Sequence, residues 1–176
     1  MRAFFTASVA AFAITAAASA DLDVGDVAPD MTLSGFQGGE AVEFTLSDAL
    51  TDGPVVAFFF PAAYTGGCEA EAALFAEAIG DFDAAGAQVI GLTAGNVDRL
   101  AEFSTQHCAD AYPVFGVDEA VIDAYDVRMR PGGDWTGRIT YVIDQESNIA
   151  FHYAAMNPSE HASRSLEAVQ GLATTQ

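Results

Sequence analysis

Apolar residues gather along the chain in short continuous runs of strand length. Residues 54–60 (PVVAFFF) and 88–92 (QVIGL) form two such runs, which are typical of strands buried in a parallel or mixed sheet. Residues 138–144 (RITYVID) and 149–153 (IAFHY) form two more, and the polar residues 145–148 between them (QESN) predict a β-hairpin. The pattern therefore predicts four strands, of which the last two are neighbours.

Three other segments carry apolar residues at helical spacing. These are residues 69–79 (EAEAALFAEAI), 97–107 (VDRLAEFSTQH) and 158–172. The first lies between the two buried runs, the second follows them, and the third follows the hairpin. Strands and helices thus alternate without an internal repeat or a linker, which predicts one compact α/β domain.

The first twenty residues (MRAFFTASVAAFAITAAASA) have the pattern of a signal peptide. Arg2 supplies a positive start, residues 3–17 an alanine-rich apolar stretch, and residues 18–20 (ASA) a small-residue cleavage site. An uncleaved membrane anchor is the alternative, but the stretch is near the lower limit of length for crossing a bilayer and is interrupted by threonine and serine. We expect cleavage after Ala20, export to a bacterial periplasm, and a mature domain of residues 21–176.

The charge of the chain narrows its range of partners. Among 176 residues there are 25 Asp or Glu and six Arg, with no Lys, and the formal net charge is -19 at pH 7. Such a chain repels nucleic acid and anionic lipid surfaces, so we expect neither as a partner. Apolar residues make up 51% of the chain, which is enough for the core of one domain.

One cysteine, Cys68, lies a short turn after the first buried run. Because that run ends near Pro61 and a helix follows, Cys68 falls in or near the first turn of the helix, at the carboxyl edge of the sheet. Unpaired amide groups and the helix dipole favour a thiolate there. The alternative is a buried cysteine that acts as a small hydrophobic residue, but the polar and flexible neighbours Thr65, Gly66 and Gly67 argue against it. The position thus predicts a reactive thiol.

The residues around this thiol resemble a known family signature. Pro61, Thr65 and Cys68 match the P-x3-T-x2-C pattern of peroxiredoxins. Glu71 stands where that family has an acidic residue, three positions after its peroxide-reactive cysteine. The thiol therefore has the sequence context of a peroxidase.

The resemblance covers nearly all of the expected mature chain. Residues 24–33 (VGDVAPDMTL) resemble the family's start, and residues 137–144 (GRITYVID) resemble the strand whose arginine, here Arg138, completes the active site. The segment PAAYTGGC, together with the later segment YAAMNPSE, is most similar to the one-cysteine alkyl hydroperoxide reductase E-like branch. The resemblance implies a thioredoxin-like fold, with a central mixed β-sheet flanked by helices, and a homodimer.

The resemblance also implies a role for each residue of the motif. Cys68 thiolate attacks the peroxide, hydrogen peroxide or an alkyl hydroperoxide, and becomes a sulfenic acid. Thr65 holds thiolate and peroxide in line, and Pro61 shields the sulfur from water. Arg138 stabilises the thiolate and the charge on the leaving oxygen, and Glu71 orients an arginine. For Glu71 the alternative is an exposed helix carboxylate.

Other polar residues are weaker candidates for the site. Arg128 and Arg130 compete with Arg138 for the role of the active-site arginine, but they flank a Pro-Gly-Gly turn, whereas Arg138 begins a strand. The three histidines are scattered without the spacing of metal ligands, so we interpret them as structural or solvated and expect neither a metal nor a cofactor; they are His107, His152 and His161.

Two other functions fit the same fold less well. A thioredoxin-type thiol-disulfide oxidoreductase needs C-x-x-C, but Glu71 occupies the second cysteine's place. A copper-delivery protein of the Sco type needs C-x3-C and a distal histidine, but Ala72 stands at the second cysteine's place and only His152 remains. A non-catalytic relative with the same fold is the remaining alternative.

The second cysteine, Cys108, has two interpretations. Paired cysteines are common in exported proteins, which favours a disulfide with Cys68. If the helix over residues 97–107 runs away from the sheet edge, however, Cys108 lies roughly 18 Å down its axis, too far for a disulfide. On that argument we predict that Cys108 is structural and that an external thiol or a thioredoxin-like partner reduces Cys68.

Overall fold

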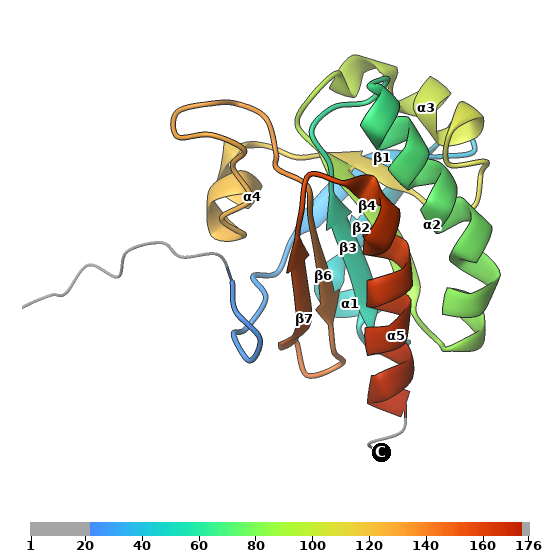
Figure 1. The fold of residues 1–176 in the computed structure, drawn as a ribbon, viewed down its shortest axis with the longest axis vertical. Coiled ribbons are helices and arrows are strands. Elements are labelled where there is room, and N and C mark those ends of the chain that lie inside the picture. The colour runs from blue at the N-terminus through green and yellow to red at the C-terminus, as the bar shows by residue number, and fades with distance from the viewer. Residues whose placement is uncertain (1–21, 174–176) are drawn as a thin grey trace, which may run out of the picture.

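A seven-stranded sheet forms the centre of the computed structural model, which describes residues 22–173 (Figure 1). Its strand order is β2-β1-β5-β4-β3-β6-β7. The strands are β1 (Thr32–Gln37), β2 (Glu40–Thr45), β3 (Val55–Phe59), β4 (Gln88–Thr93), β5 (Val114–Gly116), β6 (Ile139–Ile143) and β7 (Ile149–Ala154). The predicted signal peptide and the cleavage site after Ala20 lie outside the described residues.

The middle of the sheet is parallel and its two sides are antiparallel. β3 pairs in parallel with β4, and β4 with β5. On one side, β5 is followed by the antiparallel strands β1 and β2, and on the other side β3 is followed by the antiparallel strands β6 and β7. The sheet is therefore mixed, and the thioredoxin-like fold expected from the sequence is confirmed.

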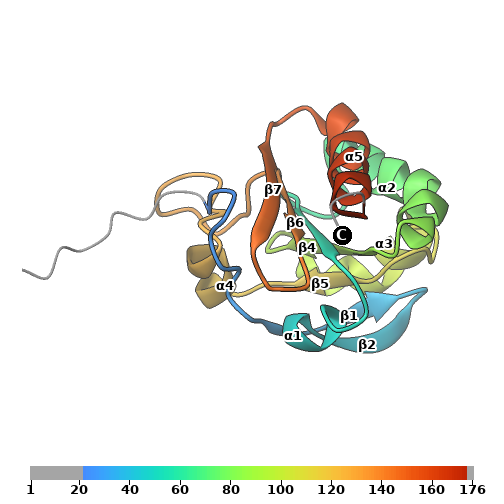
Figure 2. The ribbon, with the colours of Figure 1, turned by 90° about the horizontal axis from the view of Figure 1, so that it is seen from below.

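Successive residues of the central strands point into two separate cores. In β3, Val56 and Phe58 belong to one core, while Val55, Ala57 and Phe59 belong to the other. Burial on both faces explains why the sequence of this strand is apolar at every position. The first core is covered by α2 (Gly66–Ala84), α3 (Leu100–Gln106) and α5 (His161–Ala173), and the second by α1 (Leu46–Ala49) and α4 (Glu119–Ala124) (Figure 2).

One edge of the sheet brings together the ends of several elements. β3 ends at this edge and β6 begins there, because the two strands are antiparallel and Phe59 pairs with Ile139. α2 and α5 lie side by side and both begin at the same edge (Figure 1). Residues that follow β3, precede β6 or open these two helices therefore meet in space.

The predicted elements agree with most of the observed ones. All four predicted strands match β3, β4, β6 and β7 to within one residue at each end. The predicted helices are α2, which starts three residues earlier at Gly66, and α3 and α5, each preceded by a 3-10 turn, η1 (Val97–Arg99) or η2 (Pro158–Glu160). The elements that the sequence did not predict are β1, β2, β5, α1 and α4, which are short or lie at the side of the sheet.

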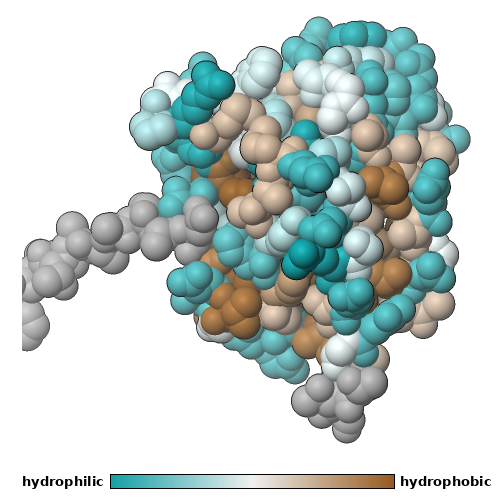
Figure 3. Space-filling view, in the orientation of Figure 1, coloured by the Kyte–Doolittle hydropathy of each residue, from teal (hydrophilic) through white to brown (hydrophobic). Residues whose placement is uncertain are grey.

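The surface is mainly hydrophilic on the face seen in Figure 3, where the hydrophobic patches are small and separate. This agrees with the acidic composition. Over residues 22–173, no helix is long and apolar enough to cross a bilayer. In the same part of the chain, no group of three or more His, Cys, Asp or Glu side chains is arranged to hold a metal ion.

Candidate active site

The loop between β3 and α2 is tied to the end of β4. Thr93 donates a hydrogen bond from Oγ1 to the Pro61 carbonyl (3.2 Å), and Asn96 donates one from Nδ2 to the Ala63 carbonyl (2.7 Å). Gly95 permits the close approach, because a Cβ atom at that position would lie 2.5 Å from the Pro61 carbonyl oxygen. The loop that leads into the thiol-bearing helix is thereby held against the sheet edge.

Cys68 lies in the first turn of α2, as the sequence predicts. Tyr64, with a left-handed backbone (φ 59°), turns the chain, and Thr65 then occupies the N-cap position of the helix without a side-chain capping hydrogen bond. The backbone N–H of Cys68 donates to the Thr65 carbonyl (2.8 Å). The Cys68 side chain faces inward, with the residue only 1% exposed, while Gly66 and Gly67 beside it are exposed.

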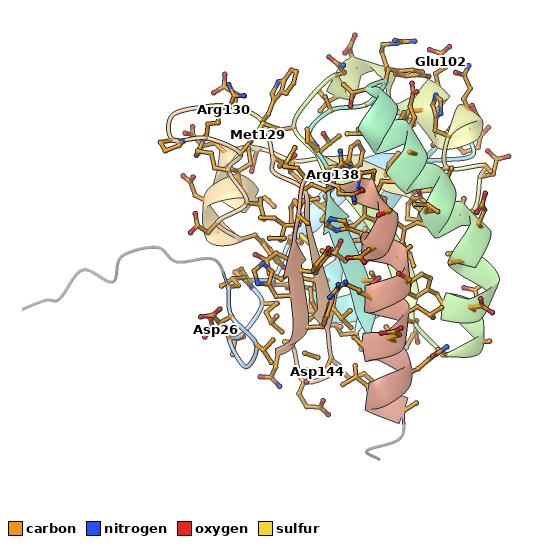
Figure 4. The ribbon with its side chains drawn as sticks, viewed as in Figure 1. Asp26, Glu102, Met129, Arg130, Arg138 and Asp144 are labelled. Atoms are coloured by element: carbon orange, nitrogen blue, oxygen red, sulfur yellow. The ribbon has the colours of Figure 1, made fainter. Side chains whose placement is uncertain are left out.

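Arg138 is the positive charge at this thiol. It lies immediately before β6, at the shared sheet edge, and Figure 4 shows it there at the upper ends of the strands. Its Nη2 lies 3.5 Å from Cys68 Sγ, its Nη1 donates to Glu71 Oε2, and its Nε donates to the Met156 carbonyl (3.1 Å). A guanidinium held in this way stabilises a thiolate and a developing negative charge beside it.

The glycine before Cys68 gives Arg138 room to reach the thiol. A Cβ atom on Gly67 would lie 3.1 Å from Arg138 Nη2, which is tighter than ordinary packing allows. A Cβ atom on Gly66, one residue earlier, would meet nothing within 4 Å. The site therefore requires a glycine at position 67 to leave room for Arg138, whereas position 66 can accept a side chain.

Glu71 is buried behind the arginine. The residue has no solvent exposure, and its Oε1 has no hydrogen-bond partner among the described residues. Burial raises the pKa of its carboxyl to about 8, although Arg138 acts in the opposite direction. The alternative of an exposed helix carboxylate is therefore wrong, and Glu71 contacts an arginine as predicted.

The structure brings the predicted site residues together, and it differs from the prediction in the hydrogen-bond partner of Thr65. The Cys68 thiol contacts the Arg138 guanidinium, and the guanidinium in turn contacts the Glu71 carboxyl. The Thr65 hydroxyl, however, donates to the Ala62 carbonyl (3.1 Å) rather than to the thiol. Its oxygen keeps lone pairs that can accept a hydrogen bond from a peroxide. Pro61 is buried at the start of the loop.

The competing arginines are engaged elsewhere. Arg128 forms ion pairs with Glu119 and Asp123 and donates to the Gly133 carbonyl. Arg130 lies on the exposed loop between α4 and β6, where Figure 4 shows it apart from Arg138. Of the three candidates, Arg138 is the one that contacts the thiol.

The sequence reasoning missed two contributors to the site. The Met156 carbonyl holds Arg138 Nε, and His161 Nδ1 lies 3.6 Å from Glu71 Oε1. His161 is fully buried, so the interpretation of this histidine as structural is correct but overlooks its place beside the site. No spacing in the sequence predicts either residue, because Met156 follows β7 and His161 begins α5, and both reach the site only through the packing of these two elements.

Cys108 is a second buried thiol. Both cysteines are free, and both belong to the core beneath α2 and α3. Burial raises the pKa of the Cys108 thiol to about 12, while a hydrogen bond with Tyr112 acts in the opposite direction. Tyr112 in turn donates from its hydroxyl to the Ala72 carbonyl on α2 (2.8 Å).

The predicted course of the helix before Cys108 is wrong. Both ends of the helical segment contact Tyr64, which lies in the loop between β3 and α2: Arg99 lies over its ring (3.5 Å to the centroid), and His107 packs edge-on against it (5.2 Å between centroids). The chain turns sharply at Asn96 (φ 56°), so that α3 lies across the loop and does not run away from it. The estimate of roughly 18 Å along the axis therefore does not measure the separation of the cysteines.

Comparisons with known proteins point to one family. The model of the AhpC/TSA family matches residues 24–152. The chain is 30% identical over 149 residues to "Peroxiredoxin Q, chloroplastic" from Oryza sativa subsp. japonica, which covers 84% of this chain and 67% of that protein. It is 25% identical over 156 residues to "Peroxiredoxin Bcp" from Bacillus subtilis (strain 168), covering 86% and 97%.

Solved structures agree with these matches. The crystal structure of peroxidoxin BcpB from Mycobacterium tuberculosis is similar with a TM-score of 0.75 and 27% identity, covering 86% of this chain and 98% of that one. AhpC from Mycobacterium tuberculosis has the same TM-score of 0.75 at 20% identity, a similarity that bears on the fold alone.

Proposed function

The chain belongs to the AhpC/TSA family, the peroxiredoxins, and is a thiol peroxidase, and we propose that Cys68 is the thiol that reacts with the peroxide. The thiolate sulfur attacks one peroxide oxygen, so that an S–O bond forms while the O–O bond breaks. Sulfur is oxidised to a sulfenic acid, and the other oxygen leaves as hydroxide or alkoxide and takes a proton from water. A thiol reductant then returns Cys68 to its reduced form.

The neighbours of Cys68 have separate tasks in this proposal. Arg138 stabilises the thiolate and the charge on the departing oxygen, and Glu71 orients its guanidinium from the far side. Thr65 accepts a hydrogen bond from the peroxide while it donates to the loop backbone. Pro61, buried at the start of the loop, excludes water from the sulfur.

The contact between Arg138 Nη2 and the buried Cys68 sulfur carries this proposal. It is tested by peroxide consumption with dithiothreitol as reductant and by trapping a sulfenic acid with dimedone in protein treated with one equivalent of peroxide. We expect the label on Cys68. Peroxide consumption with a label elsewhere, or none, contradicts the assignment.

We further propose that Cys108 stays outside the catalytic cycle, so that Cys68 works as a one-cysteine peroxidase. The support is the complete burial of Cys108, which raises the pKa of its thiol to about 12 in spite of the hydrogen bond with Tyr112, so that the protonated, unreactive form is favoured. Intact mass after peroxide treatment without reductant tests this. A species two hydrogens lighter, absent in Cys108→Ser, would show an internal disulfide instead.

The reductant and the assembly follow from the family as proposals. A thioredoxin-like protein or a small external thiol is the expected reductant, since Cys68 has no partner cysteine in the one-cysteine cycle. We also propose a homodimer, which light scattering on the purified mature chain measures directly. The assignment to the alkyl hydroperoxide reductase E-like branch likewise stays a prediction.

Export is a separate proposal that rests on the pattern of residues 1–20. The mature chain is then periplasmic and begins at Asp21. N-terminal sequencing of the protein from a periplasmic fraction tests this. Material that begins at Met1 and sediments with membranes would refute it.

A further inference from the structure

His161, the first residue of α5, is a buried titratable group that the proposed mechanism does not use. Its ring is completely shielded from solvent, yet both ring nitrogens have polar neighbours. On each side of the ring, one of these neighbours connects to Arg138: Ala155 with the adjacent Met156 carbonyl, and Glu71. The two routes involve different atoms of the guanidinium.

The first route starts at Nε2. This atom lies 2.8 Å from the Ala155 carbonyl, and since a carbonyl can only accept, Nε2 carries the hydrogen and donates it. The next carbonyl along the chain, that of Met156, accepts from Arg138 Nε (3.1 Å), and the Ala155 N–H donates to the Arg138 carbonyl (3.3 Å). His161 therefore fixes the backbone turn that holds Arg138.

The second route starts at Nδ1. This atom lies 2.8 Å from Thr140 Oγ1 and 3.6 Å from Glu71 Oε1. The other oxygen of Glu71 accepts from Arg138 Nη1. Glu71 Oε1 has no hydrogen-bond partner among the described residues. With the ring hydrogen on Nε2, Nδ1 of the neutral ring accepts from the Thr140 hydroxyl, and the imidazole acts on Glu71 by packing against Oε1.

Burial affects the charges of both groups. It raises the pKa of Glu71 to about 8 and lowers the pKa of His161, which favours a neutral ring and a protonated carboxyl. The positive charge of Arg138 is then less compensated by Glu71 and acts more on Cys68. The titratable and charged groups that face this pair are Cys68 on α2, Arg138 before β6, Tyr112 before β5, Tyr153 on β7 and Glu160 on η2.

We propose that His161 is a positioning residue for Arg138: it holds both contacts that aim the guanidinium at Cys68, so that the thiolate depends on a histidine it does not touch. The inference rests on the proposed roles of Cys68 and Arg138. Its distinguishing feature is that the two ring nitrogens act on separate contacts, so that each can be removed without the other.

The test compares three variants in the full mature chain. His161→Phe removes both contacts with little change in volume, His161→Gln places an amide near Nε2, and His161→Asn places one near Nδ1. We expect His161→Phe to move the midpoint of the Cys68 thiolate titration, followed by ultraviolet absorbance in a Cys108→Ser background, upward by about one pH unit, a tenfold change in the ionisation equilibrium. The Gln and Asn variants each recover part of this shift.

His152→Phe is the matched control. That residue is also a histidine with a buried ring nitrogen, which has no hydrogen-bond partner among residues 22–173, and its ring stacks on Tyr141 (5.0 Å between centroids). We expect the wild-type midpoint in this variant.

A wild-type midpoint in His161→Phe, or an equal shift in His152→Phe, overturns the inference. If His161→Phe does not fold, the Gln and Asn variants decide: an upward shift in both supports the inference, and wild-type midpoints in both refute it. The titration needs no turnover. A wild-type protein that consumes no peroxide would therefore defeat the assigned role of Cys68 and leave the result on His161 standing.

Discussion

The two cysteines of the chain occupy the same core and yet have opposite surroundings. Cys68 and Cys108 are both almost completely buried, and neither forms a disulfide. Cys68 faces the guanidinium of Arg138, whereas Cys108 faces the hydroxyl of Tyr112. Cys68 thus has a fixed positive charge beside its sulfur, whereas the hydroxyl beside Cys108 is neutral.

The difference teaches that burial does not decide the chemistry of a thiol in this fold. Burial alone disfavours the thiolate, and this is the condition of Cys108. At Cys68 the same burial excludes water while Arg138 supplies the opposing charge, so that the desolvated site strengthens their interaction. The following predictions test this contrast, from the largest effect to the smallest.

The largest effect is expected from exchanging the sulfur itself. Cys68→Ser should lose all measurable peroxide turnover, because a hydroxyl at this position is not a nucleophile at neutral pH. Cys108→Ser should keep turnover within about threefold and lose about 1–3 kcal/mol of unfolding free energy, since it buries a more polar group. Turnover with dithiothreitol and urea denaturation measure both. Retained turnover in Cys68→Ser would end the distinction between the two thiols.

Removing the charge should come next. Arg138→Ala is expected to slow sulfenic acid formation by about 100-fold, because one preorganised donor to the developing charge is lost. Arg128→Ala serves as the control, since that arginine pairs with α4, and should stay within about twofold of the wild type. Stopped-flow kinetics of the first turnover give the rates. Equal slowing in the two variants would remove Arg138 from its role.

Moving the charge without removing it should have a smaller effect. Gly67→Ala brings a methyl group to 3.1 Å from Arg138 Nη2 and should slow the same step by about tenfold through displacement of the guanidinium. Gly66→Ala, where the added carbon meets nothing within 4 Å, should react at the wild-type rate. The same stopped-flow assay applies. If both variants slow equally, the effect lies in the helix start and not in the arginine.

The last prediction concerns pH and stability, and its effect is measured as unfolding free energy and not as a rate. The folded-state pKa of Glu71 lies at about 8, above its ordinary value of 4.5, so its stabilising contribution is complete below about pH 4.5 and is lost as the pH rises toward 8. Glu71→Gln stays neutral, and its stability relative to the wild type should therefore increase from about pH 5 to about pH 8. Cys108, raised from 9.0 to about 12, should add no such slope below pH 9. Urea denaturation of Glu71→Gln, Cys108→Ser and wild type across this pH range tests both expectations. An unfolding free energy of Glu71→Gln that differs from the wild type by the same amount at every pH would contradict the first.

Much of the fold follows from local pattern. The strands that are buried on both faces have continuous apolar sequences, and β3, β4, β6 and β7 are predictable for that reason. β5 has only three residues, and β1 and β2 lie at the outer side of the sheet, where no continuous apolar run is required. Their pairing depends on tertiary contacts that a local window of sequence does not contain.

The site residues likewise divide into some that the sequence predicts and others that depend on tertiary packing. Cys68 and Glu71 lie one helical turn apart, so their proximity is local, and the family resemblance adds Arg138. The Met156 carbonyl and His161 reach the site through the packing of β7 and α5, and no spacing rule predicts them. The course of α3 was mistaken because the left-handed residue Asn96 redirects the chain after β4. A single non-glycine residue with positive φ leaves too weak a signal in the sequence.

The pairing of β3 with β6 determines where the chain can accept inserted residues. Phe59 pairs with Ile139, and the side chains of successive residues in β6 alternate between the two faces of the sheet. A shift by one residue would turn Arg138 to the opposite face and leave Cys68 without its cation. Extra residues at the exposed tip of the preceding loop, at Pro131 and Gly132, need not alter this pairing. Insertions at the tip of this loop can thus leave the spacing of Cys68 and Arg138 unchanged, whereas a single residue inserted within β6 would separate the thiol from the guanidinium.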